Sequence, residues 1–254
     1  MSGRPGFSAL CNPLREDPEL AEVIPPPRRQ QAIEECSAPE LRLASGGGES
    51  RVLPAFDGGI GLLVLSGLLI RHVGIRGRFG AELLGEGDLL RPWQSDQDSP
   101  LLPVETGWAV IHPARLAVLD TSFLRHLSAY PELATCFVAR ATQRSRNLAV
   151  NMAIVHQARV DVRLRMLLWH LAGRWGRVRS DGTVVPLRLT HAVLAELVAA
   201  RRPTVTSALS DLTRRGLVRA SSDGWLLYGE PPVELLDLET SSAETESHQA
   251  ASTH

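Results

Sequence analysis

The clearest pattern of hydrophobic and polar positions lies in residues 189–218, where two short helices are predicted. Thr190 can cap the first helix, because its hydroxyl can accept a hydrogen bond from a free backbone N–H of the first turn. Four apolar residues then recur at the spacing of one buried helix face. They are Val193, Leu194, Leu197 and Val198. The small residues Ala199 and Ala200 suit a tight turn after this helix.

The second predicted helix begins near Pro203, since a proline in the first turn of a helix loses no hydrogen bond. Its apolar stripe has spacings of four and three residues and consists of Val205, Leu209 and Leu212. The arginine-led polar end of this helix suits insertion into a DNA major groove. The pattern predicts a helix-turn-helix, although two short amphipathic helices joined by a tight turn also occur in many other all-α domains.

The residues that follow predict a small β-hairpin. Arg214 to Val218 ends the second helix with basic residues and a glycine. Val218–Ala220 and Trp225–Tyr228 are two short strands joined by a polar turn with a glycine. Helix, turn, helix and hairpin in this order predict a winged helix-turn-helix domain over residues 159–230.

Short strands with glycine between them are predicted before this domain, in residues 51–119. Ile60–Val73 is interpreted as two strands joined near Ser66 and Gly67, and Ala81–Leu84 as another strand. A turn follows at Gly85–Asp88, and Trp108–Ile111 is the last strand. Pro113–Leu119 is expected to begin a helical region. Strands at this short spacing predict a small β-sandwich or β-roll over residues 41–130.

A long helix is predicted from Tyr130 to about Gln157, and residues 131–158 are assigned to dimerisation. Residues at spacings of four and three form a coiled-coil-like seam along this helix. The predicted interface residues are Phe137, Ala141, Arg144, Leu148, Met152 and Val155. A symmetric partner helix would cover such a seam. The alternative is that the helix packs on its own β domain.

The two ends of the chain have a different composition. Residues 1–40 contain Pro13, Pro18, Pro25–Pro27 and Pro39 among many charges, and are expected to form a flexible or loosely docked arm. Residues 231–254 are expected to be a disordered tail, because their final stretch of Ser, Thr, Glu, Gln and Ala cannot bury enough apolar surface to fold.

Charge is distributed unevenly although the net charge is −1. Residues 159–230 hold 12 Arg against 6 acidic residues, and the rest of the chain holds 15 Arg against 22. A basic module beside an acidic one is typical of a nucleic-acid-binding domain attached to another domain. The alternative is that arginine is simply common in the proteome of origin, since the chain has no lysine, but the uneven distribution of charge argues against it.

Several other classes of protein are disfavoured. No apolar run is long enough to cross a membrane, and no signal-peptide pattern is seen, so a cytoplasmic protein is expected. The motifs of nucleophile-elbow hydrolases, phosphate-binding loops and zinc proteases are absent, so no catalytic residue is assigned and an enzyme is not expected. Glu82, Glu86 and Asp88 are interpreted as a solvated rim.

No metal site or cofactor is predicted either. Cys11, Cys36 and Cys136 are far apart in the sequence and form no closely spaced pair, so they are expected to be free thiols.

Two blocks of residues carry a family resemblance. Gly59–Leu69 with Gly87–Leu90 has the glycine and Gly-Asp turns of a β-roll, and Leu189–Val218 has the helix-turn-helix and the entry to its wing. Over residues 41–230 the chain resembles the Crp/Fnr superfamily of bacterial transcription regulators. This resemblance implies an α+β protein with a cyclic-nucleotide-binding-like β-roll. It also implies a homodimer that binds a two-fold-related site on double-stranded DNA.

The resemblance also implies roles for individual residues. It assigns base reading to Arg202, Thr206 and Ser207. It assigns DNA backbone contacts to Thr190, His191, Thr204, Ser210 and Arg214. An effector pocket is expected near Glu82, Arg91 and Trp93.

One departure concerns the effector. Cyclic-nucleotide-binding members have a Gly-Glu cassette after the Gly-Asp turn and then an arginine close to Ser or Thr, whereas this chain has Arg91-Pro92-Trp93 and no arginine in residues 94–104. A small-molecule effector other than cyclic AMP is therefore expected. RNA polymerase is a further partner that the resemblance allows. The alternative function is a protein-interaction module with a degenerate sensor domain and only non-specific DNA affinity.

Overall fold

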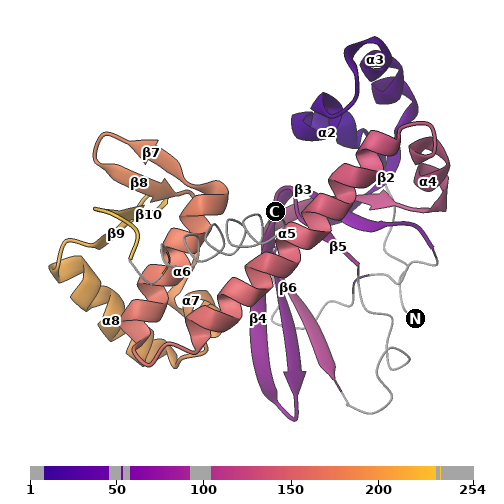
Figure 1. The fold of residues 1–254 in the computed structure, drawn as a ribbon. Coiled ribbons are helices and arrows are strands. Elements are labelled where there is room, and N and C mark those ends of the chain that lie inside the picture. Colours follow the sequence, from indigo (N-terminus) through magenta and orange to yellow (C-terminus); the bar gives the residue numbers. More distant parts are fainter. Residues whose placement is uncertain (1–8, 46–52, 54–57, 92–103, 233–234, 236–254) are drawn as a thin grey trace, which may run out of the picture. The chain divides into compact units, whose positions relative to one another are not determined.

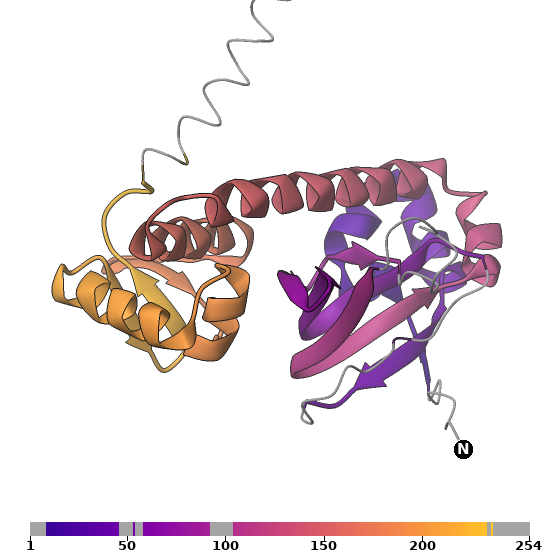
Figure 2. The ribbon, with the colours of Figure 1, turned by 90° about the horizontal axis from the view of Figure 1, so that it is seen from below.

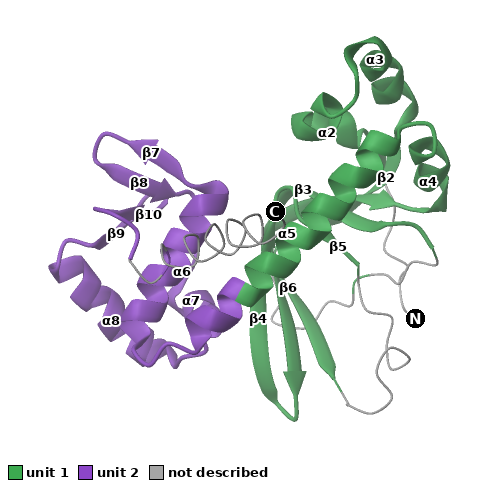
Figure 3. Cartoon of the chain, in the orientation of Figure 1, with its two compact units in different colours: residues 1–149 green, residues 150–254 purple. Residues whose placement is uncertain are grey.

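The computed structural model describes residues 9–45, 53, 58–91, 104–232 and 235. The chain divides into two units, residues 1–149 and residues 150–254, which are coloured separately in Figure 3. Figure 1 labels most of the helices and strands of both units. Each unit is described by itself below.

Unit 1 contains an antiparallel sheet with the strand order β1-β2-β6-β3-β4, in which β5 pairs with β3 (Figure 1). The strands are β1 (Ala9–Cys11), β2 (Ala38–Leu43), β3 (Gly61–Ile75), β4 (Arg78–Gly85), β5 (Leu89–Leu90) and β6 (Glu105–Leu119). The β3–β4 hairpin turns at Arg76 and Gly77, which both have positive φ angles, as a two-residue loop of type I′ requires. The predicted β-roll is thus built around one long pair, β3 and β6.

The two long strands differ from the sequence prediction. Ile60–Val73 was expected to be two strands, but β3 is one strand with register shifts between Val64 and Leu69. Gly67 has a φ of +95° there, and a Cβ atom on it would lie 2.3 Å from the carbonyl oxygen of Pro113. The expected helix at Pro113–Leu119 is also wrong, because these residues form the second half of β6.

Both faces of the β3–β6 pair are covered, which explains the unbroken apolar run at the start of β3. Leu62 and Val64 pack in one core cluster with Trp108 and Leu116, whereas Leu63 and Leu65 belong to a second cluster. The second cluster also contains residues of the N-terminal segment and the helices, including Leu14, Leu20, Ile24, Phe123, Leu133 and Phe137. Alternate residues of one strand therefore stabilise two separate cores.

Residues 9–40 are not the loosely docked arm that was expected. They form β1, α1 (Pro13–Glu16), α2 (Pro18–Glu22), α3 (Pro26–Glu35) and the start of β2. Each helix has a proline in its first turn, where no N–H is needed, so these prolines begin helices rather than extend the chain. Leu20 and Ile24 are fully buried in the second core cluster.

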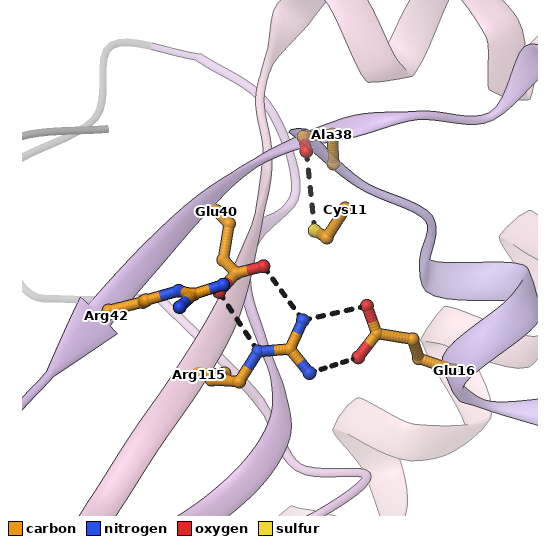
Figure 4. Close-up of polar contacts among 6 residues, drawn as sticks. All are labelled: Cys11, Glu16, Ala38, Glu40, Arg42 and Arg115. Carbon is orange, nitrogen blue, oxygen red and sulfur yellow. Dashed lines mark hydrogen bonds and ion pairs between the residues drawn. The ribbon is translucent and has the colours of Figure 1, made fainter. Parts of the chain in front are cut away.

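Ion pairs also hold this N-terminal segment on the sheet, as Figure 4 shows. The Arg115 guanidinium on β6 binds both carboxylate oxygens of Glu40 on β2, at 3.0 and 2.8 Å, and both oxygens of Glu16 on α1. Arg42 binds Glu40 from the other side. Hydrogen bonds from Arg115 lower the pKa of Glu40 to about 2, although burial of this carboxyl opposes the shift. Glu40 therefore remains charged although only 2% of it is exposed.

Two helices complete unit 1. Asp120 caps α4 (Thr121–Leu127) by accepting from the backbone N–H groups of Ser122 and Phe123. The long helix α5 (Pro131–Val155) begins in unit 1, with α2 and α3 beside its first turns (Figures 1 and 2). Arg140 on α5 binds Asp17 and Glu19 of this segment and also the carbonyl oxygen of Gly87.

Two of the six predicted dimer-interface residues, Phe137 and Arg144, contact their own unit instead. Phe137 is buried in the core of its own unit, with its ring edge-to-face to Phe123 at 6.1 Å. Arg144 binds both carboxylate oxygens of Glu82 on β4, at 2.7 and 2.9 Å. The alternative considered for this helix, packing on its own β domain, therefore holds for this face.

Unit 2 contains a helix pair and a small sheet around α6 (Val160–Trp175). The helix pair is α7 (His191–Leu197) and α8 (Arg202–Arg214). The sheet has the order β7-β8-β10-β9, with β7 (Arg177–Arg179), β8 (Gly182–Val185), β9 (Val218–Ser221) and β10 (Gly224–Leu227). The predicted hairpin after the second helix is confirmed as β9 and β10, which pair in antiparallel register.

Candidate nucleic-acid interface

The two predicted helices of residues 189–214 form as the apolar pattern indicates. Val193, Leu194, Leu197 and Val198 are buried, as are Val205, Leu209 and Leu212 on α8. The Thr190 hydroxyl accepts from the backbone N–H of Val193 at 3.3 Å, so its predicted capping role is confirmed. Pro203 lies in the first turn of α8, also as predicted.

The turn between α7 and α8 contains a feature that the sequence pattern did not reveal. Ala199 has a φ of 50°, a conformation that non-glycine residues seldom adopt. Arg163 on α6 donates from one nitrogen to the carbonyl oxygens of Val198 and Ala199, at 3.1 and 3.3 Å. These carbonyls at the end of α7 thus receive side-chain donors.

The predicted base-reading residues lie together at the exposed start of α8. Arg202, Thr206 and Ser207 are all exposed, and so are the predicted backbone contacts Thr204 and Ser210. Hydroxyls on this helix donate to the carbonyl oxygen four residues earlier: Ser207 to Pro203 at 3.2 Å and Ser210 to Thr206 at 2.9 Å. Within the part of the chain that the structure describes, Arg202 forms no ion pair, so its guanidinium can bind another group.

His191 and Arg214, which were predicted to contact the DNA backbone, both have partners within the chain. Nδ1 of His191, the first residue of α7, lies 3.0 Å from Oγ1 of Thr206. The His191 ring also lies 6.2 Å from the ring of Trp225. Arg214 is 78% exposed but forms an ion pair with Asp211 one turn earlier. Asp211 therefore offsets part of the positive charge near the end of α8.

A groove beside the wing is lined by Thr190 and by residues that were not predicted to contact DNA. It has a volume of about 380 Å³ and is lined in part by Arg188, Thr190, Ser221, Ser222 and Trp225. Arg188 is exposed just before α7, and the two serines lie at the turn of the wing. A guanidinium and hydroxyls along one groove can donate to phosphate oxygens. Only tertiary structure reveals this set, because residues 188–190 and the wing are apart in sequence.

Two of the three residues assigned to an effector pocket, Glu82 and Arg91, lie within the described part of the chain. Glu82 is buried and its carboxylate binds Arg71 at 2.8 Å as well as Arg144. Burial lowers the pKa of Arg71, although the charge of Glu82 opposes this shift. Arg91 is exposed after β5, and Trp93 lies outside the described residues.

The solvated rim expected from the acidic residues of this region is wrong for two of its three members. Besides the buried Glu82, Asp88 is buried and accepts from the backbone N–H of Gly85 at 2.8 Å, so it stabilises the β4–β5 turn. Only Glu86 is exposed.

All three cysteines are free thiols, as expected. Burial raises the pKa of Cys11 and Cys36 to about 11, which keeps both thiols protonated at neutral pH. Among the described residues, no three His, Cys, Asp or Glu side chains come together in a way that could hold a metal ion. No helix in the described part of the chain combines the length and apolar character needed to span a membrane.

Unit 2 is therefore a winged helix-turn-helix domain, with an exposed arginine and hydroxyls at the start of its second helix. The family model of the Crp-like helix-turn-helix domain matches residues 162–228. Residues 162–228 are thus similar to the Crp-like helix-turn-helix domain, which confirms the resemblance drawn from Leu189–Val218.

Solved structures extend the likeness to the fold of both units. The chain is similar to a cyclic nucleotide-binding domain containing protein from Listeria monocytogenes EGD-e, with 14% identity, a TM-score of 0.60 and coverage of 83% of this chain and 96% of that chain. A mutant of CooA from Carboxydothermus hydrogenoformans has 15% identity, a TM-score of 0.57 and coverage of 89% and 94%. FixK2 from Bradyrhizobium japonicum has 14% identity, a TM-score of 0.55 and coverage of 76% and 93%.

These comparisons confirm the predicted α+β fold, in which an antiparallel sensor-type sheet precedes a Crp-like helix-turn-helix domain. No curated protein sequence matches the chain.

Proposed function

We propose that this protein is a sequence-specific transcription regulator that binds a two-fold-related operator as a homodimer. The observation that carries the proposal is the exposed N-terminal end of α8, where Arg202, Thr206 and Ser207 are all exposed. Such a helix can place its first turns against base edges in a major groove.

The second part of the proposal is the dimer. The four remaining interface residues, Ala141, Leu148, Met152 and Val155, lie at spacings of seven, four and three on α5 and are exposed or half-buried. Val138, which was not predicted to lie in the interface, is three residues before Ala141 and so extends this spacing toward the start of α5. Val138 is 66% exposed and Met152 is 63% exposed. A second copy of the helix would cover this seam.

The third part concerns the sensor unit and its partners. We propose that an effector other than cyclic AMP acts on unit 1, since Arg91 is followed by Pro92, which has no N–H to donate to a phosphate. The ion-paired state of Glu82 supports this, because a ligand at this carboxylate would have to displace Arg71 or Arg144. RNA polymerase is the proposed protein partner at the operator.

Selection of genomic DNA fragments by the purified protein, over a series of salt concentrations, tests the proposal. A shared palindromic site with half-sites about one helical turn apart is the expected result. Binding without sequence preference that vanishes as salt rises would contradict it and favour the protein-interaction module.

Two arginine variants refine this test. Arg202→Ala is expected to weaken binding to the selected site by about 10- to 100-fold while changing binding to random DNA much less, because a base contact is lost. Arg214→Ala should weaken binding to both DNAs by a similar factor, because a phosphate contact carries no sequence information. Equal losses on specific and random DNA for Arg202→Ala would contradict its assignment to base reading.

A further inference from the structure

The hydroxyl of Thr206 is held by groups on both helices of the helix-turn-helix. Its Oγ1 lies 3.1 Å from the carbonyl oxygen of Arg202 on α8 and 3.0 Å from Nδ1 of His191 on α7. Ser207 and Ser210, on the same helix, have only a carbonyl partner among the described residues. Thr206 is exposed, so this doubly bonded hydroxyl lies on the outer surface of α8.

The number of protons on the Thr206 hydroxyl determines whether it can donate a hydrogen bond to a third group or only accept one. A threonine hydroxyl has one proton and two lone pairs. The carbonyl oxygen of Arg202 can only accept, so it takes the proton of Thr206. His191 must then donate its Nδ1–H to one lone pair of Oγ1. One lone pair remains, and the hydroxyl can accept one further hydrogen bond but has no proton to donate.

The other tautomer of His191 leads to the same result. With its proton on Nε2, the imidazole accepts at Nδ1, and the Thr206 proton goes to this nitrogen instead of the Arg202 carbonyl. In both arrangements the only proton of the hydroxyl is used within the protein.

We infer that Thr206 determines specificity as a hydrogen-bond acceptor, and that His191 is the positioning residue that keeps it so. The inference rests on the proposed function, in which α8 enters the major groove. There, adenine and cytosine present amino donors, whereas guanine and thymine present acceptors. Thr206 therefore selects adenine or cytosine on the strand that it faces. His191 acts through Thr206 rather than through a phosphate.

The test starts from the site that the wild-type protein selects. Dissociation constants are measured at one salt concentration on sites that carry each of the four bases, in turn, at every position of both half-sites. At one position the wild type is expected to bind adenine or cytosine about 3- to 10-fold more tightly than guanine or thymine, the size of one hydrogen bond. Thr206→Val should remove this preference, and Thr206→Ser, which keeps the hydroxyl, should retain it.

A matched control lies on the same helix. Thr213 lies two turns after Thr206 and is exposed, and its side chain has no hydrogen bond within the described residues. Thr213→Val makes the same chemical change as Thr206→Val and is expected to leave the preference at every position unchanged. Thermal unfolding of all variants confirms that each one folds.

Two variants of His191 test its positioning role. His191→Leu removes the ring nitrogen, so the hydroxyl can turn and donate to guanine or thymine, and the preference should fall to about 2-fold or less. His191→Asn places an amide donor near the Nδ1 position and should retain the preference. A simple loss of a phosphate contact would instead weaken binding to all four bases equally.

The outcomes separate this inference from the proposed function. If no shared site is selected, the proposed function itself is wrong. If a shared site is selected but the Thr206-dependent position prefers guanine or thymine, or does not exist, the inference about Thr206 is overturned. Equal weakening of all four bases by His191→Leu overturns the positioning role of His191, and the proposed function stands.

Discussion

The conformation of Ala199 determines how α7 connects to α8. Its φ of 50° lies in the left-handed region, which costs a residue with a Cβ atom roughly 1–2 kcal/mol. The Arg163 side chain compensates in part, because it donates to the carbonyl oxygens of Val198 and Ala199. The turn is therefore held by a side chain of another helix rather than by the preference of its own residues.

Replacing Ala199 by glycine should stabilise unit 2 for this reason. We expect Ala199→Gly to raise the free energy of unfolding by about 1 kcal/mol, because glycine adopts a positive φ without a steric penalty. Denaturant unfolding measures the change. Ala192→Gly, at an exposed position within α7, is the control and should lower stability by about 0.5–1 kcal/mol. A lower stability of Ala199→Gly would contradict the role assigned to this conformation.

Single residues also explain why the sites were only partly predictable. Arg202, Thr206 and Ser207 could be placed on an exposed helix face, since capping, proline and apolar spacing agree within one short segment. The ion pairs of Glu82 with Arg71 and Arg144 join residues far apart in the sequence, and periodicity carries no information on such pairs. The contact between His191 and Thr206 follows from how α7 and α8 pack, which the separate helix patterns do not specify.

At the scale of elements, α6 contains a half-buried histidine that links the stability of unit 2 to pH. Burial, and to a lesser extent the charge of Arg174, lowers the pKa of His170 from its usual 6.5 to about 4. Its Nε2 atom is buried and has no hydrogen-bond partner within the described residues. Between these two pH values the unfolded chain binds more protons than the folded one, so stability falls as the pH falls below about 6.5.

His170→Phe should remove this dependence. For the parent chain we expect the step from pH 7.5 to pH 5 to lower the free energy of unfolding of unit 2 by about 2 kcal/mol through this residue alone. Urea unfolding of parent and variant at both pH values measures the difference. The same substitution at the exposed His156 is the control. An identical pH dependence in parent and His170→Phe would contradict the assignment.

Helices and strands were predicted correctly where the local sequence signals agree, and incorrectly where burial against other elements determines the structure. The boundaries of α7 and α8 follow from Thr190, Pro203 and the apolar stripes. The long strands β3 and β6 were broken up or misassigned, because a run that is buried on both faces shows no alternation. The N-terminal helices were missed, because a proline can either begin a helix or extend a chain, and only packing against the sheet distinguishes the two.

At the scale of the whole molecule, α5 has two apolar faces with different roles. One face carries Leu133, Phe137 and Arg144 and packs against its own unit. The other carries Val138, Ala141, Leu148 and Met152 and leaves them exposed or half-buried. The sequence pattern placed residues of both faces in one seam. Positions 137 and 138 are each compatible with the spacings of three and four residues that define such a seam.

The exposed face should decide the oligomeric state, and two alanines of α5 form a matched pair to test this. Ala141 lies on the exposed seam, whereas Ala139 is exposed on another face of the same helix. Ala141→Glu places two like charges across a symmetric helix pair and is expected to weaken dimerisation by about 100-fold or more, since like charges in contact cost several kcal/mol. Ala139→Glu adds the same charge outside the seam and should leave the dimer intact.

Sedimentation equilibrium of the full chain, with and without operator DNA, gives the dimer dissociation constants for both variants. Operator affinity should fall together with dimerisation for Ala141→Glu, because a monomer engages only one half-site. If both variants dimerise like the parent chain, the seam is not the interface. If Ala141→Glu abolishes the dimer but retains operator binding, a single half-site suffices for binding and the proposed two-fold operator is wrong. Both the oligomeric state and the two-fold operator depend on this exposed face, because the other face of α5 already packs against its own unit.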